Sequence, residues 1–197
     1  MPIFDNFSIS IDRGTLLLLT GPNGVGKTTF LDLVAYLKQP TLGHIEVAAN
    51  NLEYLQQDYA RSLFPWHDVA WNICLPLLVN HPLSKSERYA TANKLCKKLE
   101  LELPLRELPF RLSGGQKHLV TLLRSFVGNP DILLLDEPAT GLDSINATKF
   151  WSALNRYKTT RPDLTVVCVS HQNSLDFHHE RLEMFGRPVN AKRLKGL

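Results

Sequence analysis

The 197-residue sequence has no apolar run that approaches the ~20 residues needed to span a lipid bilayer, and its N-terminus lacks the basic start and apolar stretch of a signal peptide. Cysteine is also scarce, and the three cysteines are Cys74, Cys96 and Cys168. They lie far apart in the sequence and do not have the spacing of metal ligands. An odd number of cysteines without a secretion signal indicates reduced thiols and a cytoplasmic protein. We therefore expect any membrane association to go through another protein.

A strong excess of charge of one sign is missing as well. The formal net charge is +3, which is too small to indicate nucleic-acid binding by itself. Hydrophobic residues make up 44% and charged residues 21% of the chain, as is usual for a soluble globular protein. A chain of this length is expected to form one domain with a substantial core.

The most informative motif is a glycine-rich stretch between a predicted strand, residues 16–20, and a predicted helix, residues 27–37. The stretch fits the phosphate-binding pattern of Gly, four residues, Gly-Lys and Ser or Thr, in which curled backbone N–H groups and the helix dipole attract phosphate. This pattern predicts that Lys27 reaches the β- and γ-phosphates and that Thr28 binds Mg²⁺. The predicted phosphate-binding residues are Gly21, Pro22, Asn23, Gly24, Val25, Gly26, Lys27, Thr28 and Thr29.

A second motif places two carboxylates at the end of a later strand. Residues 132–135 form a continuous apolar run, which is typical of a parallel strand buried on both faces. Asp136 and Glu137 follow at the end of the strand where an open α/β sheet binds its ligand. We expect Asp136 to hold Mg²⁺, directly or through water, and Glu137 to polarise a water that attacks the γ-phosphate.

A third motif begins a helix predicted over residues 113–127. A serine cap and two glycines leave free N–H groups at this helix start, which can meet a phosphate. One chain cannot readily use two such phosphate cradles on one nucleotide. The residues of this motif are Ser113, Gly114, Gly115 and Gln116.

The remaining patterns predict an α/β fold with a mostly parallel sheet. Residues 7–11 alternate apolar with polar side chains, as in a strand with one buried face at an antiparallel edge. A capping-box pattern opens the helix that begins at Ser84. The predicted strands are 7–11, 16–20, 45–47, 52–55, 132–135 and 165–169, and the predicted helices are 27–37, 84–98, 113–127 and about 145–157. We expect a single domain over residues 1–197, with a P-loop core at about 1–58 and 131–197 and a helical subdomain at about 59–130.

These motifs, in this order, resemble the ATP-binding subunit of ABC transporters over nearly the whole chain. The resemblance implies an ATPase that uses ATP and Mg²⁺, and a head-to-tail dimer in which the Leu-Ser-Gly-Gly-Gln signature of one subunit closes over the ATP of the other. The second subunit would be an identical copy or a related chain. The resemblance also implies roles for three further residues: Gln57, with Gln56 as the alternative, touches Mg²⁺ and the attacking water, Asp143 communicates across the dimer, and His171 contacts the γ-phosphate and orients the water.

Two features depart from the family pattern. The aromatic residue that stacks on adenine in this family lies well upstream of the phosphate loop, before the first residue of this sequence. We therefore expect weaker and less base-selective ATP binding, unless Phe4, Phe7 or another nearby ring replaces it. Residues 43–57 are also shorter than the family's β-rich arm, so we expect a reduced antiparallel β edge.

A short stretch favours an importer. Residues 63–69, followed by Asn72, are similar to the corresponding segment of importers for nitrate, sulfonates and taurine. We therefore expect a multi-span membrane permease as the partner, a location at the cytoplasmic face of the cell (inner) membrane, and no direct contact with nucleic acid. Phe64, Pro65 and Trp66 would contact the permease, and the alternative is that Trp66 belongs to the core.

Three other functions stay open. The chain could be a small exporter subunit, a non-transport ABC ATPase acting on DNA or ribosomes, or a regulatory subunit that binds ATP without cleaving it. The second type carries a long coiled-coil insertion or two ATP-binding domains, and this sequence contains neither. The presence of Lys27, Gln57, Asp136, Glu137 and His171 argues against the third.

Overall fold

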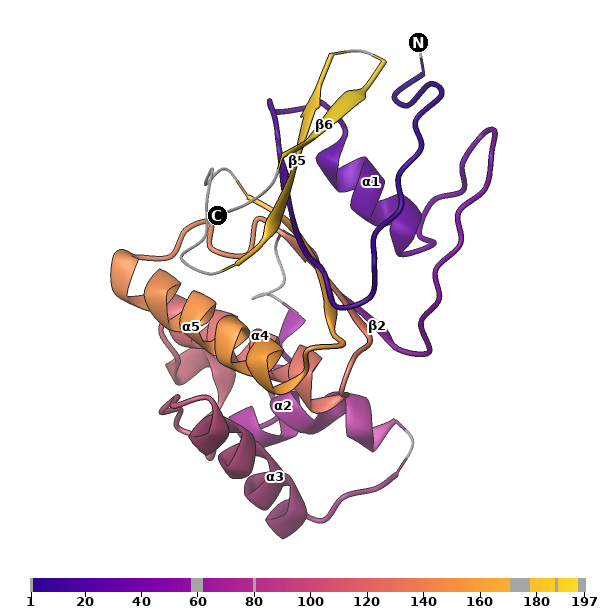
Figure 1. The fold of residues 1–197 in the computed structure, drawn as a ribbon. Helices are drawn as coiled ribbons and strands as arrows, with labels where there is room; N and C mark the ends of the chain where they lie inside the picture. Colours follow the sequence, from indigo (N-terminus) through magenta and orange to yellow (C-terminus); the bar gives the residue numbers. More distant parts are fainter. Residues whose placement is uncertain (1, 58–61, 80, 171–177, 187, 195–197) are drawn as a thin grey trace. The chain divides into compact units, whose positions relative to one another are not determined.

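A computed structural model describes residues 2–57, 62–79, 81–170, 178–186 and 188–194 (Figure 1). The chain divides into two compact units. Unit 1 contains residues 1–56, 131–138 and 163–197, and unit 2 contains residues 57–130 and 139–162. In the part of the chain that is described, no helix has the length and apolar character needed to span a membrane.

Unit 1 is built on a six-stranded sheet with the order β2-β3-β4-β1-β5-β6, and it also contains helix α1. Its elements are β1 (Leu16–Thr20), α1 (Lys27–Val34), β2 (Leu52–Leu55), β3 (Ile132–Asp136), β4 (Thr165–Val169), β5 (Glu180–Phe185) and β6 (Asn190–Leu194). All neighbouring strands are parallel except β5 and β6. The predicted α/β class with a mostly parallel sheet is therefore confirmed.

The central strands are apolar because both of their faces are covered. All five residues of β1 and of β4 are buried, and the two strands pair in register from Leu16 with Val166 to Leu19 with Val169. β3 pairs with β4 on the other side and ends at Asp136, opposite Val169. Because the strands are parallel, the carboxyl ends of β1 and β3 lie at the same edge of the sheet, where α/β folds bind ligands.

Two predicted strands are wrong. Neither residues 7–11 nor residues 45–47 are assigned to a strand, although half-buried and exposed residues alternate in both segments. Phe7, Ile9 and Ile11 pack against the core. The alternation of apolar and polar residues therefore arises because one side of this segment is buried, although the segment is not paired as a strand. The antiparallel edge of the sheet is instead formed by β5 and β6, which the sequence did not predict.

The first helix is shorter than predicted. α1 ends at Val34, and Tyr36 has a φ of 56°, in the left-handed region that interrupts a helix. The N–H groups of Leu37 and Lys38 then both donate to the carbonyl of Asp32, at 2.9 and 3.2 Å. Leu37, the last apolar residue of the predicted helix, is exposed and lies beyond the end of α1.

Unit 2 consists of helices with well-formed N-terminal caps. Its elements are α2 (Val69–Leu78), α3 (Lys85–Lys98), the 3₁₀ turn η2 (Pro109–Arg111), α4 (Gly114–Val127) and α5 (Ser144–Thr160). The predicted capping box at Ser84 is present, and Ser113 caps α4 in the same way, with Gln116 as its reciprocal partner. Asp143 caps α5.

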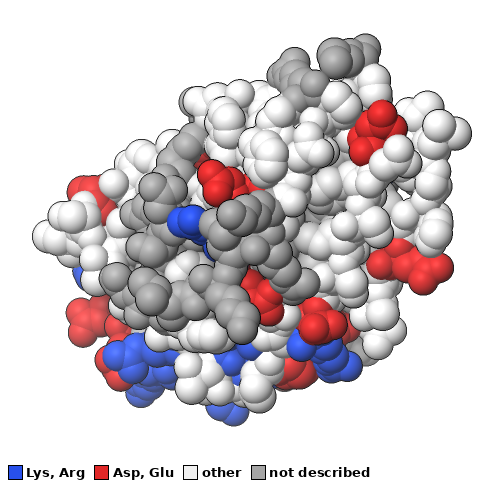
Figure 2. All heavy atoms as spheres, turned by 45° about the horizontal axis from the view of Figure 1, so that its top comes forward, with Lys and Arg blue, Asp and Glu red and all other residues white. Residues whose placement is uncertain are grey.

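The two units differ in charge. Unit 1 contains 8 Lys and Arg residues and 12 Asp and Glu residues, whereas unit 2 contains 14 and 7. On the face that Figure 2 draws, blue basic and red acidic side chains lie beside one another along the lower part of the surface. The charge difference between the units therefore does not appear on this face as one large patch of a single sign.

Candidate nucleotide site

The glycine-rich loop follows β1 directly and leads into α1, as predicted. Gly21 and Gly26 have φ values of 141° and 124°, which side chains other than glycine rarely adopt. A Cβ at Gly21 would lie 2.2 Å from the carbonyl oxygen of Met184, and one at Gly26 would lie 2.8 Å from the Ile3 side chain. Glycine at both positions therefore permits the close packing that curls the loop.

Lys27 begins α1 and is only 6% exposed. Its ammonium group folds back over the loop and donates hydrogen bonds to the carbonyl oxygens of Gly21, at 2.8 Å, and Pro22, at 3.1 Å. A buried cation at the start of a helix, beside a glycine loop, is the arrangement that attracts phosphate in P-loop proteins.

Thr28 and Asp136 meet across the carboxyl edge of the sheet. The Thr28 hydroxyl donates to Asp136 Oδ2 at 2.8 Å, although the two residues are 108 positions apart in the sequence. Asp136 is 4% exposed, and this burial raises the pKa of its carboxyl, as do the neighbouring charges of Glu137 and Asp32. The hydrogen bond from Thr28 and the charge of Lys27 lower it. A hydroxyl and a carboxylate are hard oxygen ligands, and Mg²⁺ in nucleotide sites usually takes one or two carboxylates together with phosphates. The residues present therefore fit a magnesium ion.

Glu137 follows β3 with a φ of 50°, which is uncommon for a residue with a side chain. Its N–H donates to the carbonyl of Val169, the last residue of β4, at 3.0 Å. This hydrogen bond continues the pairing of β3 and β4 for one position and fixes the half-buried residue at the sheet edge, next to Asp136.

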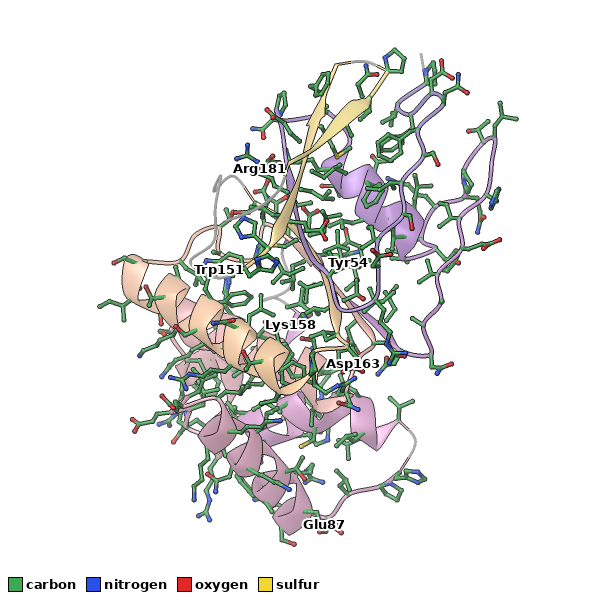
Figure 3. The ribbon with its side chains drawn as sticks, viewed as in Figure 1. Tyr54, Glu87, Trp151, Lys158, Asp163 and Arg181 are labelled. Carbon is green, nitrogen blue, oxygen red and sulfur yellow. The ribbon has the colours of Figure 1, made fainter. Side chains whose placement is uncertain are left out.

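Tyr54 and Asp32 form a pair beside this edge that the sequence did not predict. The Tyr54 side chain extends from β2 (Figure 3), and its hydroxyl donates to Asp32 Oδ1 on α1 at 3.3 Å. The ammonium group of Lys38 lies 2.7 Å from Asp32 Oδ2. Burial raises the pKa of Tyr54, and the charges of Asp136 and Asp32 raise it further. Tyr54 therefore stays neutral and keeps its hydroxyl as a donor.

The signature motif lies in unit 2, at the first turn of α4. The Ser113 hydroxyl accepts from Gln116 N at 3.2 Å, and the Gln116 side chain accepts from Ser113 N at 2.9 Å. Ser113 and Gly114 are exposed, whereas Gly115 is buried. The exposed part of the motif is thus a rigid helix start whose serine is already in its capping geometry.

Asp143 caps the neighbouring helix α5. Its two carboxylate oxygens accept from Asn146, from the backbone N–H at 2.8 Å and from the side-chain amide at 2.7 Å. These hydrogen bonds, the backbone one first, lower the pKa of Asp143. Asn146 carries no signal in the sequence that would have marked it.

The other predicted contacts are distributed as follows. Gln56 and Gln57 both follow β2 and are exposed, and His171 lies outside the described residues.

Phe4 and Phe7 pack against each other, with ring centroids 5.2 Å apart, and against Phe30 of α1. Both rings therefore contribute to the core of unit 1.

Trp66 is 69% exposed, so the alternative that it belongs to the core is wrong. Its loop is nevertheless fixed, because the side chain of the fully buried Asn72 bonds to the backbone of Phe64, His67 and Asp68. Arg124 of α4 completes this clamp, since it donates to the side chain of Asn72 at 2.7 Å and to its carbonyl at 2.8 Å. The sequence did not single out Arg124.

Comparison with known proteins agrees with this geometry. The family model described as ABC transporter matches residues 4–140, which include the glycine loop, the signature and Asp136–Glu137. The chain belongs to the ABC transporter family. The predicted enzyme class, an ATP-binding ATPase domain, is confirmed by this membership.

Among the relatives, the aliphatic sulfonates import ATP-binding protein SsuB 1 of Shouchella clausii is 33% identical over 86% of this chain and 65% of its own length. The lipoprotein-releasing system ATP-binding protein LolD 1 of Chlorobium chlorochromatii is 30% identical over 87% of this chain and 75% of its own length. A solved dimeric ATP-binding cassette in a post-hydrolysis state, bound to ADP and Pi, superimposes with a TM-score of 0.80 at 27% identity and covers 99% of this chain and 92% of its own. The chain spans only 38 to 65% of the length of the first curated relatives that it matches.

Proposed function

We propose that this chain binds and hydrolyses ATP as the nucleotide-binding domain of an ABC transporter, an importer, and that it works as a head-to-tail dimer. The domain would extend over residues 1–197. The observation that carries the proposal is the hydrogen bond between Thr28 and Asp136, because it joins the phosphate loop to the strand end with the two carboxylates. Buried Lys27 supplies the positive charge beside it.

The roles proposed for Lys27, Thr28, Asp136 and Glu137 follow from these positions, and those proposed for Gln57 and His171 come from the resemblance to the family. The loop N–H groups and Lys27 bind the phosphates, and Thr28, Asp136 and Gln57 hold Mg²⁺, which when bound neutralises phosphate charge. Glu137 takes the proton of the attacking water, and His171 orients that water and contacts the γ-phosphate. The raised pKa of Asp136 falls back toward its ordinary range when a cation binds beside it, because the cation favours the carboxylate.

The signature residues and Asp143 would act on the ATP of a second copy. Ser113 and Asp143 are exposed caps at the starts of α4 and α5 in unit 2. The excess of basic residues in unit 2 and of acidic residues in unit 1 favours a head-to-tail arrangement, in which unit 2 of one copy faces unit 1 of the other. The solved cassette supports a dimer, since it is itself dimeric, and a related chain could take the place of the second copy.

The transport role is supported by the relatives and by one exposed loop. The sulfonate relative is named as an import protein, in agreement with the similarity of residues 63–69 to such importers. Trp66 is exposed on a loop that Asn72 and Arg124 hold in place, which suits a contact with a permease at the cytoplasmic face of the membrane. The lipoprotein-releasing relative favours a second candidate, a subunit of a system that does not import.

The decisive experiment for ATP hydrolysis is Glu137→Gln. The variant should bind ATP but turn it over at least about a hundredfold more slowly, because the proton acceptor is lost. Size-exclusion chromatography with light scattering should show a dimer of the variant with ATP and Mg²⁺ and a monomer with ADP. Unimpaired turnover together with a monomer under both conditions would disprove the proposal.

The transport role is tested separately by purification from solubilised membranes. Wild-type protein should recover a multi-span membrane protein, and Trp66→Ala should lose it while its ATPase rate in isolation changes less than about twofold. The control is Phe110→Ala, since Phe110 is equally exposed (67%) but lies in η2. Recovery of ribosomes or DNA in place of a membrane protein would show that the transport role is wrong.

A further inference from the structure

Helices α4 and α5 are clamped together at both ends. Near their C-termini the rings of Phe126 and Tyr157 stack, with centroids 3.9 Å apart and an angle of 5°, and the Tyr157 hydroxyl donates to the Phe126 carbonyl at 2.9 Å. Near their N-termini Gly115 contacts Asn146. The interval along α4 from Gly115 to Phe126 equals that along α5 from Asn146 to Tyr157, so the helices run side by side in the same direction for about three turns (Figure 1).

The N-terminal contact is so close that only glycine fits. A Cβ at Gly115 would lie 2.2 Å from Asn146 Cγ and 2.4 Å from Asn146 Nδ2. Gly115 is helical and buried, so the need for glycine comes from Asn146 and not from the backbone conformation. By contrast, a Cβ at Gly114 would meet no atom within 4 Å.

The same asparagine side chain also holds Asp143. The Asn146 amide donates to Asp143 Oδ2, and the Asn146 backbone N–H donates to Oδ1. One residue therefore supplies a donor to each carboxylate oxygen of the α5 cap, while its amide carbon lies over the signature helix. Ser113 and Asp143 are the exposed caps of two helices that are joined at this point.

We propose that Asn146 is a positioning residue that fixes the distance between the signature turn and Asp143, so that both approach the ATP of the second copy as one rigid body. The inference rests on the proposed head-to-tail dimer. A smaller side chain would leave space above Gly115 and remove the side-chain donor to Asp143. A longer one could not occupy the gap between the two helix starts.

The test compares Asn146→Ala with Asn155→Ala, which makes the same change at an exposed position of the same helix. For Asn146→Ala we expect kcat to fall about tenfold and the KM for ATP to change less than about twofold, because the misplaced groups act on the closed dimer and not on initial binding. Asn155→Ala should behave as the wild type. A kcat equal to that of the control, or a fall in kcat that only follows a loss of folded protein, would overturn the proposal.

A double-mutant cycle keeps the test independent of folding problems in one variant. Gly115→Ala should lower kcat, because its methyl group meets the Asn146 amide. Gly115→Ala combined with Asn146→Ala should be no slower than Asn146→Ala alone, since the added methyl group has no amide to meet once residue 146 is alanine. Multiplicative losses would show that the two residues act independently and that the proposal is wrong. If the wild type neither hydrolyses ATP nor dimerises, the proposed function fails instead.

Discussion

The two units hold their functional groups in different ways. In unit 1 the sheet does the positioning: the glycine loop follows β1, Asp136 ends β3, and Glu137 continues the pairing with β4. In unit 2 polar side chains do it, since Asn72 and Arg124 hold the loop with Trp66 and Asn146 joins the caps of α4 and α5. The units also differ in charge, with an acidic excess in unit 1 and a basic excess in unit 2.

This difference indicates a division of labour. The proposed ATP-binding groups of unit 1 lie within one chain, at strand ends that the core fixes. In the proposed dimer the groups of unit 2 act on a nucleotide presented by another chain, and their positions depend on a few side-chain hydrogen bonds. Changes to the phosphate-binding residues of unit 1 should therefore abolish binding, whereas changes to the signature and the Asp143 cap in unit 2 should leave binding intact and affect later steps.

The largest effect is expected from complementation between the units. Lys27→Ala removes the phosphate-binding cation of unit 1, and Gly114→Asp places a carboxylate in the signature, where the structure has space for it. Each variant alone should lose at least about a hundredfold in ATPase rate. A mixture of the two should recover activity, because one of the two sites in the mixed dimer combines an intact loop with an intact signature.

The readout is the ATPase rate as a function of the mixing ratio, with Gly114→Ala as the control for a neutral side chain at the same position. Titration calorimetry should show ATP binding to Gly114→Asp and none to Lys27→Ala. If the mixture stays inactive although mixed dimers form, the loop and the signature do not cooperate between chains.

The next largest effect is on the stability of unit 2. Asn72→Ala removes five side-chain hydrogen bonds, so that the backbone N–H and carbonyl of Phe64 and one guanidinium nitrogen of Arg124 each lose the partner that Asn72 supplies. We expect the free energy of unfolding to fall by about 3 kcal/mol, measured by urea denaturation, because buried polar groups are left unsatisfied. Asn155→Ala is the control, and a change below about 0.5 kcal/mol for Asn72→Ala would show that the clamp contributes little.

Much of unit 1 could be predicted because its signals are local. The runs 16–20, 132–135 and 165–169 are apolar without interruption, and such runs are strands buried on both faces. The prediction failed at 7–11 and 45–47, where alternation alone cannot tell a paired strand from an extended segment. It missed β5 because charged residues occupy half of that strand.

In the candidate site, too, the residues with a local sequence pattern could be predicted and the others could not. The glycine loop, Asp136 and the cap at Ser113 belong to fixed sequence patterns, so their geometry could be expected. Arg124, Asn146 and the pair of Tyr54 and Asp32 have no such pattern, because each acts through a residue that is distant in the sequence or on another element. Only the folded chain brings these residues to their partners.

The smallest effect tests the electrostatics of unit 1 without nucleotide. Burial raises the pKa of Asp136 in the folded protein above its value in the unfolded chain, so ionising this carboxyl opposes folding. The wild type should therefore lose stability as the pH rises from the unfolded-state pKa of about 3.9 through the higher folded value. Asp136→Asn has no such cost, and its amide oxygen can still accept from Thr28.

We expect Asp136→Asn to raise the thermal unfolding midpoint of the nucleotide-free protein at about pH 8, and we expect this advantage to shrink toward about pH 3, where the carboxyl is mostly neutral in both states. Asp5→Asn, at an exposed position of the same unit, should leave the midpoint unchanged at both pH values. With ATP and Mg²⁺ the order should reverse, because only the wild-type carboxylate can bind the cation. Destabilisation by Asp136→Asn at both pH values would mean that the charged hydrogen bond from Thr28 outweighs the cost of burying the carboxylate.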